Sequence, residues 1–178
     1  MMQDKAAEMP GSNPLKGASI IAALKRCKVE YVTALPDIVT CDGVLWPLTG
    51  DTDLKLITVC KEDEGVSICT GLSYSGRRAV LLMQHTGFLD SVNAIRAIAM
   101  EYGHPVVMIV GLQGMEPDRL PAESGQYGIR ILEPIITAMG MDYALLSTDE
   151  DTEAIVPAID KAYADSTPFV FLVTRSPE

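Results

Sequence analysis

The stretch that decides the fold is Lys61–Asn93, KEDEGVSICTGLSYSGRRAVLLMQHTGFLDSVN. It opens with three acidic residues at the start of a predicted helix rich in small side chains, and a short apolar strand follows. A polar loop with one glycine then leads into a second predicted helix. This order places a carboxylate and a loop at the same edge of a parallel sheet, where the ligands of open α/β folds bind.

The rest of the chain continues this alternation of short apolar strands with helices or long connections. Strands are predicted at Val29–Ala34, Leu54–Val59, Ala79–Met83, Pro105–Gly111, Tyr143–Leu146 and Pro168–Val173. Helices are predicted at Leu15–Cys27, Glu62–Gly76, Leu89–Tyr102, Ile129–Met139 and Asp149–Ala164, with a short helix plus loop at Asp37–Gly50 and a loop at Leu112–Gln126. Such crossover connections require a parallel sheet. We therefore predict one three-layer α/β/α domain over residues 15–178 with a six-stranded, mostly parallel sheet, preceded by a flexible tail at residues 1–14.

Two prolines and one threonine refine the helix predictions. Pro134 is expected to kink the helix at Ile129–Met139 or to delay its start, and Pro157 conflicts mildly with the helix that contains it. Thr148 is expected to cap that last helix, with Asp151 completing an acidic variant of the capping box.

The composition of the chain limits which binding partners and which cellular compartment are expected. The chain has 178 residues and a formal net charge of −10, which argues against nucleic acid or an anionic membrane as the main partner. Its apolar runs are too short to span a membrane, and its start lacks the apolar core of a signal peptide. The four cysteines form no CxxC pair and there are only two histidines, so a zinc site is not expected. Scattered cysteines of this kind are typical of a reduced cytoplasmic protein.

The ends of the predicted strands supply the candidate functional residues, because parallel strands bring their carboxyl ends to one edge. The first strand is followed by Asp37, the second by Glu62, Asp63 and Glu64, the third by Gln84, His85, Thr86 and Gly87, and the fourth by Gln113, Gly114, Glu116 and Asp118. On the residues alone, the three consecutive acids are better explained as a solvated helix start that the helix dipole stabilises than as a catalytic group. His104 precedes the fourth strand at the opposite edge, so no catalytic role is expected for it.

The pattern resembles the pyrimidine-binding domain of thiamine diphosphate enzymes. It is most similar to the alpha subunit, or N-terminal half, of sulfopyruvate and phosphonopyruvate decarboxylases. In that family a catalytic glutamate opens a small-residue helix and a glycine follows nine positions later, as Glu62 and Gly71 do here. The stretch LLMQHTGFLDSVNAI is similar to the family's strand, polar loop and Asn-bearing helix, and Asp37 matches an acid at the end of its first strand. The resemblance extends from about Leu15 to Val173.

The resemblance implies a cofactor and roles for these residues. Glu62 would bind the aminopyrimidine ring of thiamine diphosphate, with Gln84, Thr86, Gly87 and Asn93 as further cofactor-binding residues. Asp37 and His85 would assist proton transfer after carbon dioxide leaves. Gln113 and Arg119 are the candidate substrate residues, although relatives tend to carry Arg near Gln113 and Asn at His85. The residues do not decide which of Glu62, Asp63 and Glu64 faces the cofactor.

The chain lacks the family's GDG motif, which with Mg²⁺ holds the cofactor's diphosphate. A beta subunit carrying that domain is therefore the expected partner, and a small anionic 2-oxo acid is the expected substrate. The isolated chain could form a homodimer through the small-residue helix at Glu62–Gly76.

Three other interpretations remain open at this point. The chain could belong to another thiamine diphosphate enzyme, a carboligase or another 2-oxo acid decarboxylase, and the departures at His85 and Gln113 motivate this alternative. It could keep the fold as a non-catalytic assembly module. A flavodoxin-like nucleotide binder is the weakest alternative, because no Gly-rich phosphate loop of the Walker type is present.

Overall fold

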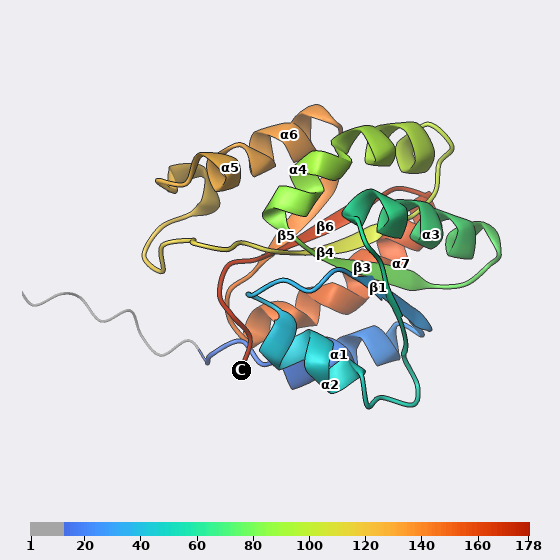
Figure 1. The fold of residues 1–178 in the computed structure, drawn as a ribbon, viewed down its shortest axis with the longest axis horizontal. Coiled ribbons are helices and arrows are strands. Elements are labelled where there is room, and N and C mark those ends of the chain that lie inside the picture. The colour runs from blue at the N-terminus through green and yellow to red at the C-terminus, as the bar shows by residue number, and fades with distance from the viewer. Residues whose placement is uncertain (1–12) are drawn as a thin grey trace, which may run out of the picture.

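The sheet at the centre of the molecule is six-stranded and entirely parallel, with the strand order β2-β1-β3-β4-β6-β5 (Figure 1). The computed structural model describes residues 13–178. The predicted flexibility of residues 1–12 lies outside this range. Residues 13 and 14, which we assigned to the tail, are placed against the domain: Pro14 forms a bridge with Thr148, and the Asn13 side-chain amide donates a 3.0 Å hydrogen bond to Glu150.

All six predicted strands are confirmed, each within two residues at either end. They are β1 Tyr31–Ala34, β2 Lys55–Thr58, β3 Ala79–Gln84, β4 Val107–Gly111, β5 Asp142–Leu146 and β6 Phe169–Val173. The helices are α1 Gly17–Arg26, α2 Trp46–Leu48, α3 Glu62–Tyr74, α4 His85–Ala94, α5 Tyr127–Arg130, α6 Leu132–Ala138 and α7 Ile155–Asp165. The π-helical turns η1 Cys41–Leu45 and η2 Ile95–Met100 and the 3₁₀ turns η3 Pro121–Glu123 and η4 Glu150–Ala154 complete the elements.

Helices cover both faces of the sheet, which confirms the three-layer α/β/α prediction. Figure 1 shows α1, α2 and α7 below the sheet and α3, α4, α5 and α6 above it. Each layer has its own apolar core, one containing Ile20, Leu45 and Ile159 and the other Val66, Phe88 and Ile136. Because apolar side chains fill both faces, the central strands carry unbroken apolar runs instead of alternating patterns.

The chain reverses its direction of travel across the sheet between β1 and β3. From β1 it passes outward to β2 at one edge of the sheet, and β3 then pairs with the other side of β1. The connection after β1 runs below the sheet, whereas β3 leads into α4 above it (Figure 1). Such a reversal opens a crevice at the carboxyl ends of the two strands, which is where open α/β sheets bind their ligands.

One predicted loop is wrong. The polar residues after β3 do not form a loop ahead of a helix beginning at Leu89; instead, α4 begins at His85 directly after the strand. Gln84 is the extended residue before the helix, and His85 and Gly87 are already buried in its first turn. Their polarity suggested a loop, but the first turn of a helix leaves its backbone N–H groups unpaired within the helix and therefore tolerates the same residues.

The predicted interruption at Pro134 is confirmed, but only half of the predicted capping box is present, because the described residues donate no hydrogen bond to the Thr148 side chain. The helix containing Pro134 is interrupted at Ile131, between α5 and α6. Pro157 is the third residue of α7, close to the point where the 3₁₀ turn η4 passes into this α-helix. The carboxylate of Asp151 accepts hydrogen bonds of 2.8 Å from the backbone N–H groups of Ser147 and Thr148, as a capping box requires.

Within the described residues, no helix combines the length and the apolar character needed to cross a bilayer.

A glycine sets the distance between α3 and the sheet. A Cβ atom added at Gly65 would lie 2.5 Å from Cδ1 of Leu81, which is fully buried on β3. The same addition at Gly71, two turns further along α3, meets nothing within 4 Å. The first glycine is therefore required for close packing, and the second is not.

We predict opposite effects on stability for two substitutions in α3. Gly65→Ala should lower the free energy of unfolding by roughly 1–3 kcal/mol, because the new methyl group overpacks the contact with Leu81. Gly71→Ala should raise it by up to about 1 kcal/mol through helix propensity alone. Urea unfolding of both variants measures the difference, and equal effects would show that Gly65 does not set the helix–sheet spacing.

Candidate active site

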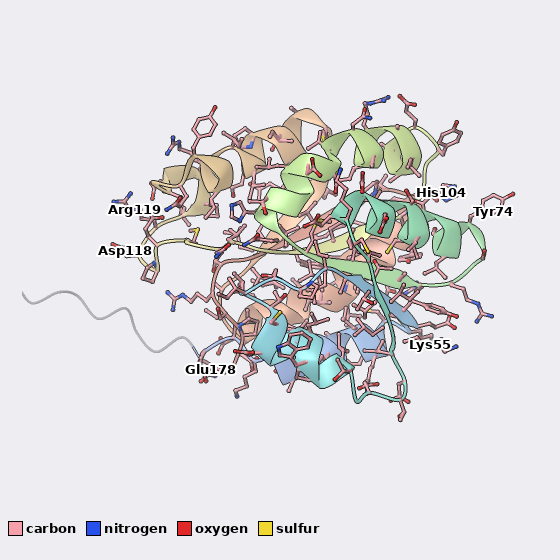
Figure 2. All side chains as sticks on the ribbon, viewed as in Figure 1. Lys55, Tyr74, His104, Asp118, Arg119 and Glu178 are labelled. Atoms are coloured by element: carbon pink, nitrogen blue, oxygen red, sulfur yellow. The ribbon has the colours of Figure 1, made fainter. Side chains whose placement is uncertain are left out.

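The candidate site lies in the crevice where the carboxyl ends of β1 and β3 separate. The residues that follow these strands approach it from below and above the sheet, and the start of α3 brings a third group from the end of β2. Figure 2 labels Asp118 and Arg119 on this side of the molecule, whereas Tyr74 and His104 lie at the opposite edge. His104 is thus far from the crevice, as its place before β4 predicted.

The three consecutive acids at the start of α3 have different surroundings. Glu64 accepts a 2.9 Å hydrogen bond from the backbone N–H of Cys60, and Asp63 forms a 3.3 Å ion pair with Lys61. Glu62 has no hydrogen-bond or ion-pair partner among residues 13–178, although it is half-buried. Of the three carboxylates, Glu62 is therefore the one left available for a ligand.

Glu62 extends across to the first turn of α4. Its carboxylate lies against the Cα of Gly87, so closely that a Cβ atom there would come within 2.1 Å of Oε1 and 2.2 Å of Cδ. The two helix starts are also joined by Lys61, which pairs with Asp63 on α3 and, at 3.0 Å, with Asp90 on α4. A glycine at position 87 thus allows the carboxylate to lie between the helix N-termini, where the helix dipoles favour negative charge.

Asp37 lies after β1 on the lower side of the crevice and is 5% exposed. Its Oδ1 atom accepts hydrogen bonds from the backbone N–H groups of Val39 at 2.8 Å and Thr40 at 3.3 Å, and Oδ2 accepts one from the Thr40 hydroxyl. Burial raises the pKa of Asp37 above its usual value, and these hydrogen bonds offset part of the rise. Asp37 therefore shapes the turn that leads into η1, whatever further role it has.

His85 lies at the start of α4 on the upper side of the crevice and is 8% exposed. Among the described residues its buried Nδ1 atom has no hydrogen-bond partner. Burial lowers the pKa of His85 below its usual value, against the opposing effects of the Gly111 backbone and the charge of Asp37. The imidazole is thus neutral at pH 7, with one ring nitrogen able to donate a hydrogen bond and the other able to accept one.

Gly111, the last residue of β4, lies between Asp37 and His85. Because it has no side chain, both groups can approach its backbone. A Cβ atom there would lie 2.5 Å from Oδ1 of Asp37, and the Gly111 backbone also acts on the His85 ring. An acid with a raised pKa and a histidine with a lowered one therefore lie on the two sides of one crevice, an arrangement that is typical of sites that move protons.

A short chain of polar side chains crosses the rim of the crevice. The Thr86 hydroxyl donates a 2.8 Å hydrogen bond to Oε1 of Gln84, and the Gln84 amide donates to Oε1 of Gln113. This chain links the end of β3, the start of α4 and the connection after β4. Both Gln113 and Thr86 are exposed, so their free polar atoms can reach a ligand in the crevice.

Two residues that the resemblance assigned to the site lie apart from this cluster. Asn93 is exposed eight residues beyond His85, about 12 Å along α4, where its side-chain oxygen accepts hydrogen bonds from Arg96. Arg119 is exposed on the long connection after β4, 3.8 Å from the carboxylate of Glu116. Arg119 lines a cavity to which Gln113 does not contribute.

The structure also adds residues that sequence reasoning missed. Thr40 is fully buried and holds Asp37 through both its backbone and its hydroxyl. An aspartate followed three positions later by threonine is typical of a side-chain-stabilised turn, so this pairing was readable in the sequence. The role of Gly111 was not readable, because it depends on the pairing of β4 with β3.

The described residues include no group of three or more His, Cys, Asp or Glu side chains arranged to hold a metal ion. They do include an unpaired carboxylate at Glu62, uncharged hydrogen-bonding groups at Gln84 and His85, and a close approach to the backbone at Gly87. This donor set fits an uncharged heteroaromatic ring that carries nitrogen donors and acceptors. It does not include cations for a diphosphate.

Comparisons with known proteins give relatives of one kind. The sulfopyruvate decarboxylase subunit alpha of Methanococcus maripaludis is 32% identical over 119 residues, which cover 66% of this chain and 71% of the relative. The protein of that name from Methanocaldococcus jannaschii is 26% identical over 105 residues, 59% of this chain and 62% of the relative. Sulfopyruvate decarboxylase of Methanosarcina acetivorans is 24% identical over 157 residues, which cover 87% of this chain but only 39% of that protein. No model of a protein family matches the chain.

We predict that His85 makes folding stability depend on pH. Because its pKa is lower in the folded state, the unfolded chain binds more protons below about pH 6.5, and stability falls as the pH drops from there to the folded pKa. His85→Asn should reduce this part of the pH dependence, whereas His104→Asn, at the opposite edge, should leave it unchanged. Urea unfolding from pH 5 to pH 8 measures the slopes, and identical slopes for wild type and His85→Asn would contradict the burial of a neutral imidazole.

Proposed function

Because the chain belongs to the family of sulfopyruvate decarboxylase alpha subunits, we propose that it is the pyrimidine-binding half of a thiamine diphosphate-dependent decarboxylase. The proposed reaction converts sulfopyruvate to sulfoacetaldehyde and carbon dioxide, with sulfopyruvate favoured over phosphonopyruvate. The observation that carries the proposal is Glu62, the half-buried carboxylate without a partner at the crevice, in a chain related to these enzymes.

Thiamine diphosphate, when bound, supplies the electron sink needed to break the bond between the 2-oxo carbon and the carboxylate. The Glu62 carboxylate would share a proton with a ring nitrogen of the aminopyrimidine. The Glu62 carboxylate lies between the starts of α3 and α4, which would orient it for this task. The neighbouring Asp63 carboxylate is already paired with Lys61. Gln84 and the backbone at Gly87 would orient the ring, and Thr86 would fix Gln84 through its hydrogen bond.

His85 and Asp37 would handle the proton that the product requires once carbon dioxide has left. The Nδ1 atom of His85 is buried without a partner and is therefore free to exchange a hydrogen bond with a reacting molecule. Asp37 has all its hydrogen bonds to the chain itself, so its part would be to hold negative charge or a proton near the imidazole. Burial favours the protonated form of Asp37, whereas the three hydrogen bonds donated to its carboxylate favour the charged form.

The proposal requires a beta subunit. The crevice residues of this chain offer no unpaired cation for a diphosphate or a sulfonate, because Lys61 already pairs with two carboxylates and His85 is neutral. The partner would supply Mg²⁺, the diphosphate site and a cation for the substrate's sulfonate. The match to only 39% of the Methanosarcina acetivorans protein, which is named as the decarboxylase itself, is consistent with an enzyme larger than this chain.

The direct test is carbon dioxide release from sulfopyruvate and from phosphonopyruvate, with thiamine diphosphate and Mg²⁺. The full chain is assayed alone and co-expressed with its candidate beta subunit. We expect turnover of sulfopyruvate only with both subunits. Glu62→Gln should lower kcat by roughly 10²–10⁴-fold, because it removes the proton-sharing carboxylate without changing the shape of the side chain. The matched Asp63→Asn variant should stay within about threefold of wild type, since it loses only an exposed ion pair.

The other outcomes select the other interpretations. Cofactor binding by the complex without turnover of either acid would indicate another 2-oxo acid decarboxylase or a carboligase. A complex that assembles but binds no cofactor would indicate an assembly module. Equal loss of activity in the Glu62 and Asp63 variants would contradict a specific role for Glu62.

Asp37→Asn separates the two possible roles of Asp37. The asparagine oxygen can keep the hydrogen bonds from Val39 and Thr40, so the turn and the stability at pH 7 should be maintained within about 1 kcal/mol. If Asp37 holds a proton near His85, kcat should fall at least tenfold and its pH profile should change. Unchanged turnover would mean that Asp37 is a turn-forming residue only.

A further inference from the structure

A cavity lies at the same edge of the sheet, beyond β4. It has a volume of about 440 Å³, within the usual size of small-molecule sites, and it lies between the connection after β4 and the carboxyl ends of β5 and β6. Strand positions separate it from the crevice, because β4 and β6 lie between β3 and β5. Arg175 follows β6, two strands from β3, so at about 4.8 Å a strand it begins roughly 10 Å from the end of β3.

Arg175 gives this cavity an available positive charge. Its guanidinium donates a 3.0 Å hydrogen bond to the carbonyl oxygen of Pro117. Among the described residues no carboxylate lies within ion-pair distance of it, whereas the other arginine of the cavity, Arg119, faces Glu116. A guanidinium has five N–H donors in a fixed fork, so Arg175 keeps donors for a planar or tetrahedral anion.

The carboxylates around the cavity are placed so that they do not cancel this charge. Glu116 accepts hydrogen bonds from the Ser124 hydroxyl at 2.7 Å and from the Gly125 N–H at 2.9 Å, and it faces Arg119. Asp118 and Glu123 are exposed, and Figure 2 shows Asp118 at the periphery of the molecule. Arg175 is exposed too, so water screens its charge as it screens theirs, and an anion must contact the guanidinium directly to be held there.

The remaining walls are apolar or carry hydroxyl groups. Met115, Leu120 and Leu145 supply the apolar surface. The hydroxyls of Thr174 and Ser147 lie beside Arg175 and are joined to each other by a 2.8 Å hydrogen bond. This combination suits a ligand with one anionic head group and a short apolar body.

We propose that this cavity is a second binding site, which takes a small organic anion with a carboxylate or sulfonate head and pairs that head with Arg175. Binding there requires neither the cofactor nor the beta subunit. The connection that forms its wall also carries Gln113, which is hydrogen-bonded to Gln84 at the crevice. A ligand in the cavity would therefore restrain the connection after β4, whose other end lies at the proposed active site.

The test is an NMR titration of the ¹⁵N-labelled full chain with propane-1-sulfonate and with butyrate, at constant ionic strength, beside butan-1-ol as an uncharged analogue. We expect both anions to shift the amide signals of the non-proline residues among 115–123 and 174–175, with a dissociation constant on the order of 1 mM for so small a ligand. The alcohol should bind at least tenfold more weakly.

Arg175→Met keeps the apolar part of the side chain and removes the charge, so the affinity for both anions should fall at least tenfold. Arg77→Met is the matched control, because it removes the same charge from an exposed arginine outside the cavity. Arg175→Lys should retain an intermediate affinity and provides a second variant if the methionine variant is unstable. Equal binding by wild type and both Arg175 variants, or shifts confined to residues 84–87, would overturn the proposal.

Discussion

The contact between Glu62 and Gly87 is the constraint on which the site depends. Three consecutive carboxylates cannot all occupy one crevice, and the structure distributes them by giving Asp63 to Lys61 and Glu64 to the backbone of Cys60. Glu62 alone crosses to α4, and only a glycine at position 87 leaves room for its carboxylate. Gly65 makes this reach possible from the other side, since it sets α3 close against Leu81 of β3. The position of the Glu62 carboxylate thus depends on two glycines, Gly65 and Gly87, at which a side chain would not fit.

The fold could be read from the sequence because its signals are local and repeated. Runs such as Val106–Val110 have no polar alternation, so they indicated strands buried on both faces, and the helical connections between them required parallel pairing. The residues after β3 were misread as a loop, because polar residues and glycine suit both a loop and the first turn of a helix. Their spatial neighbours settle the question, since His85 and Gly87 are buried against other segments.

From the sequence, the site could be predicted only as a list of the residues that follow the carboxyl ends of the strands. That list brought Asp37, Glu62 and His85 to one edge, but it could not choose among the three acids, because the choice depends on the partners of Asp63 and Glu64. The resemblance grouped Arg119 with Gln113, whereas Arg119 lines a cavity to which Gln113 does not contribute. The partners of Asp63 and Glu64 are themselves local, but the contact of Glu62 with Gly87 joins two different helices, and no local pattern in one sequence records it.

The most direct test of the account is the structure of the complex between this chain and its beta subunit with thiamine diphosphate bound. The account predicts a Glu62 carboxylate oxygen within about 2.6–3.2 Å of a ring nitrogen of the aminopyrimidine. Asp63 and Glu64 should keep their contacts with Lys61 and Cys60. A cofactor ring bound away from the crevice, or bound there to Asp63 or Glu64 with Glu62 turned to solvent, would contradict it.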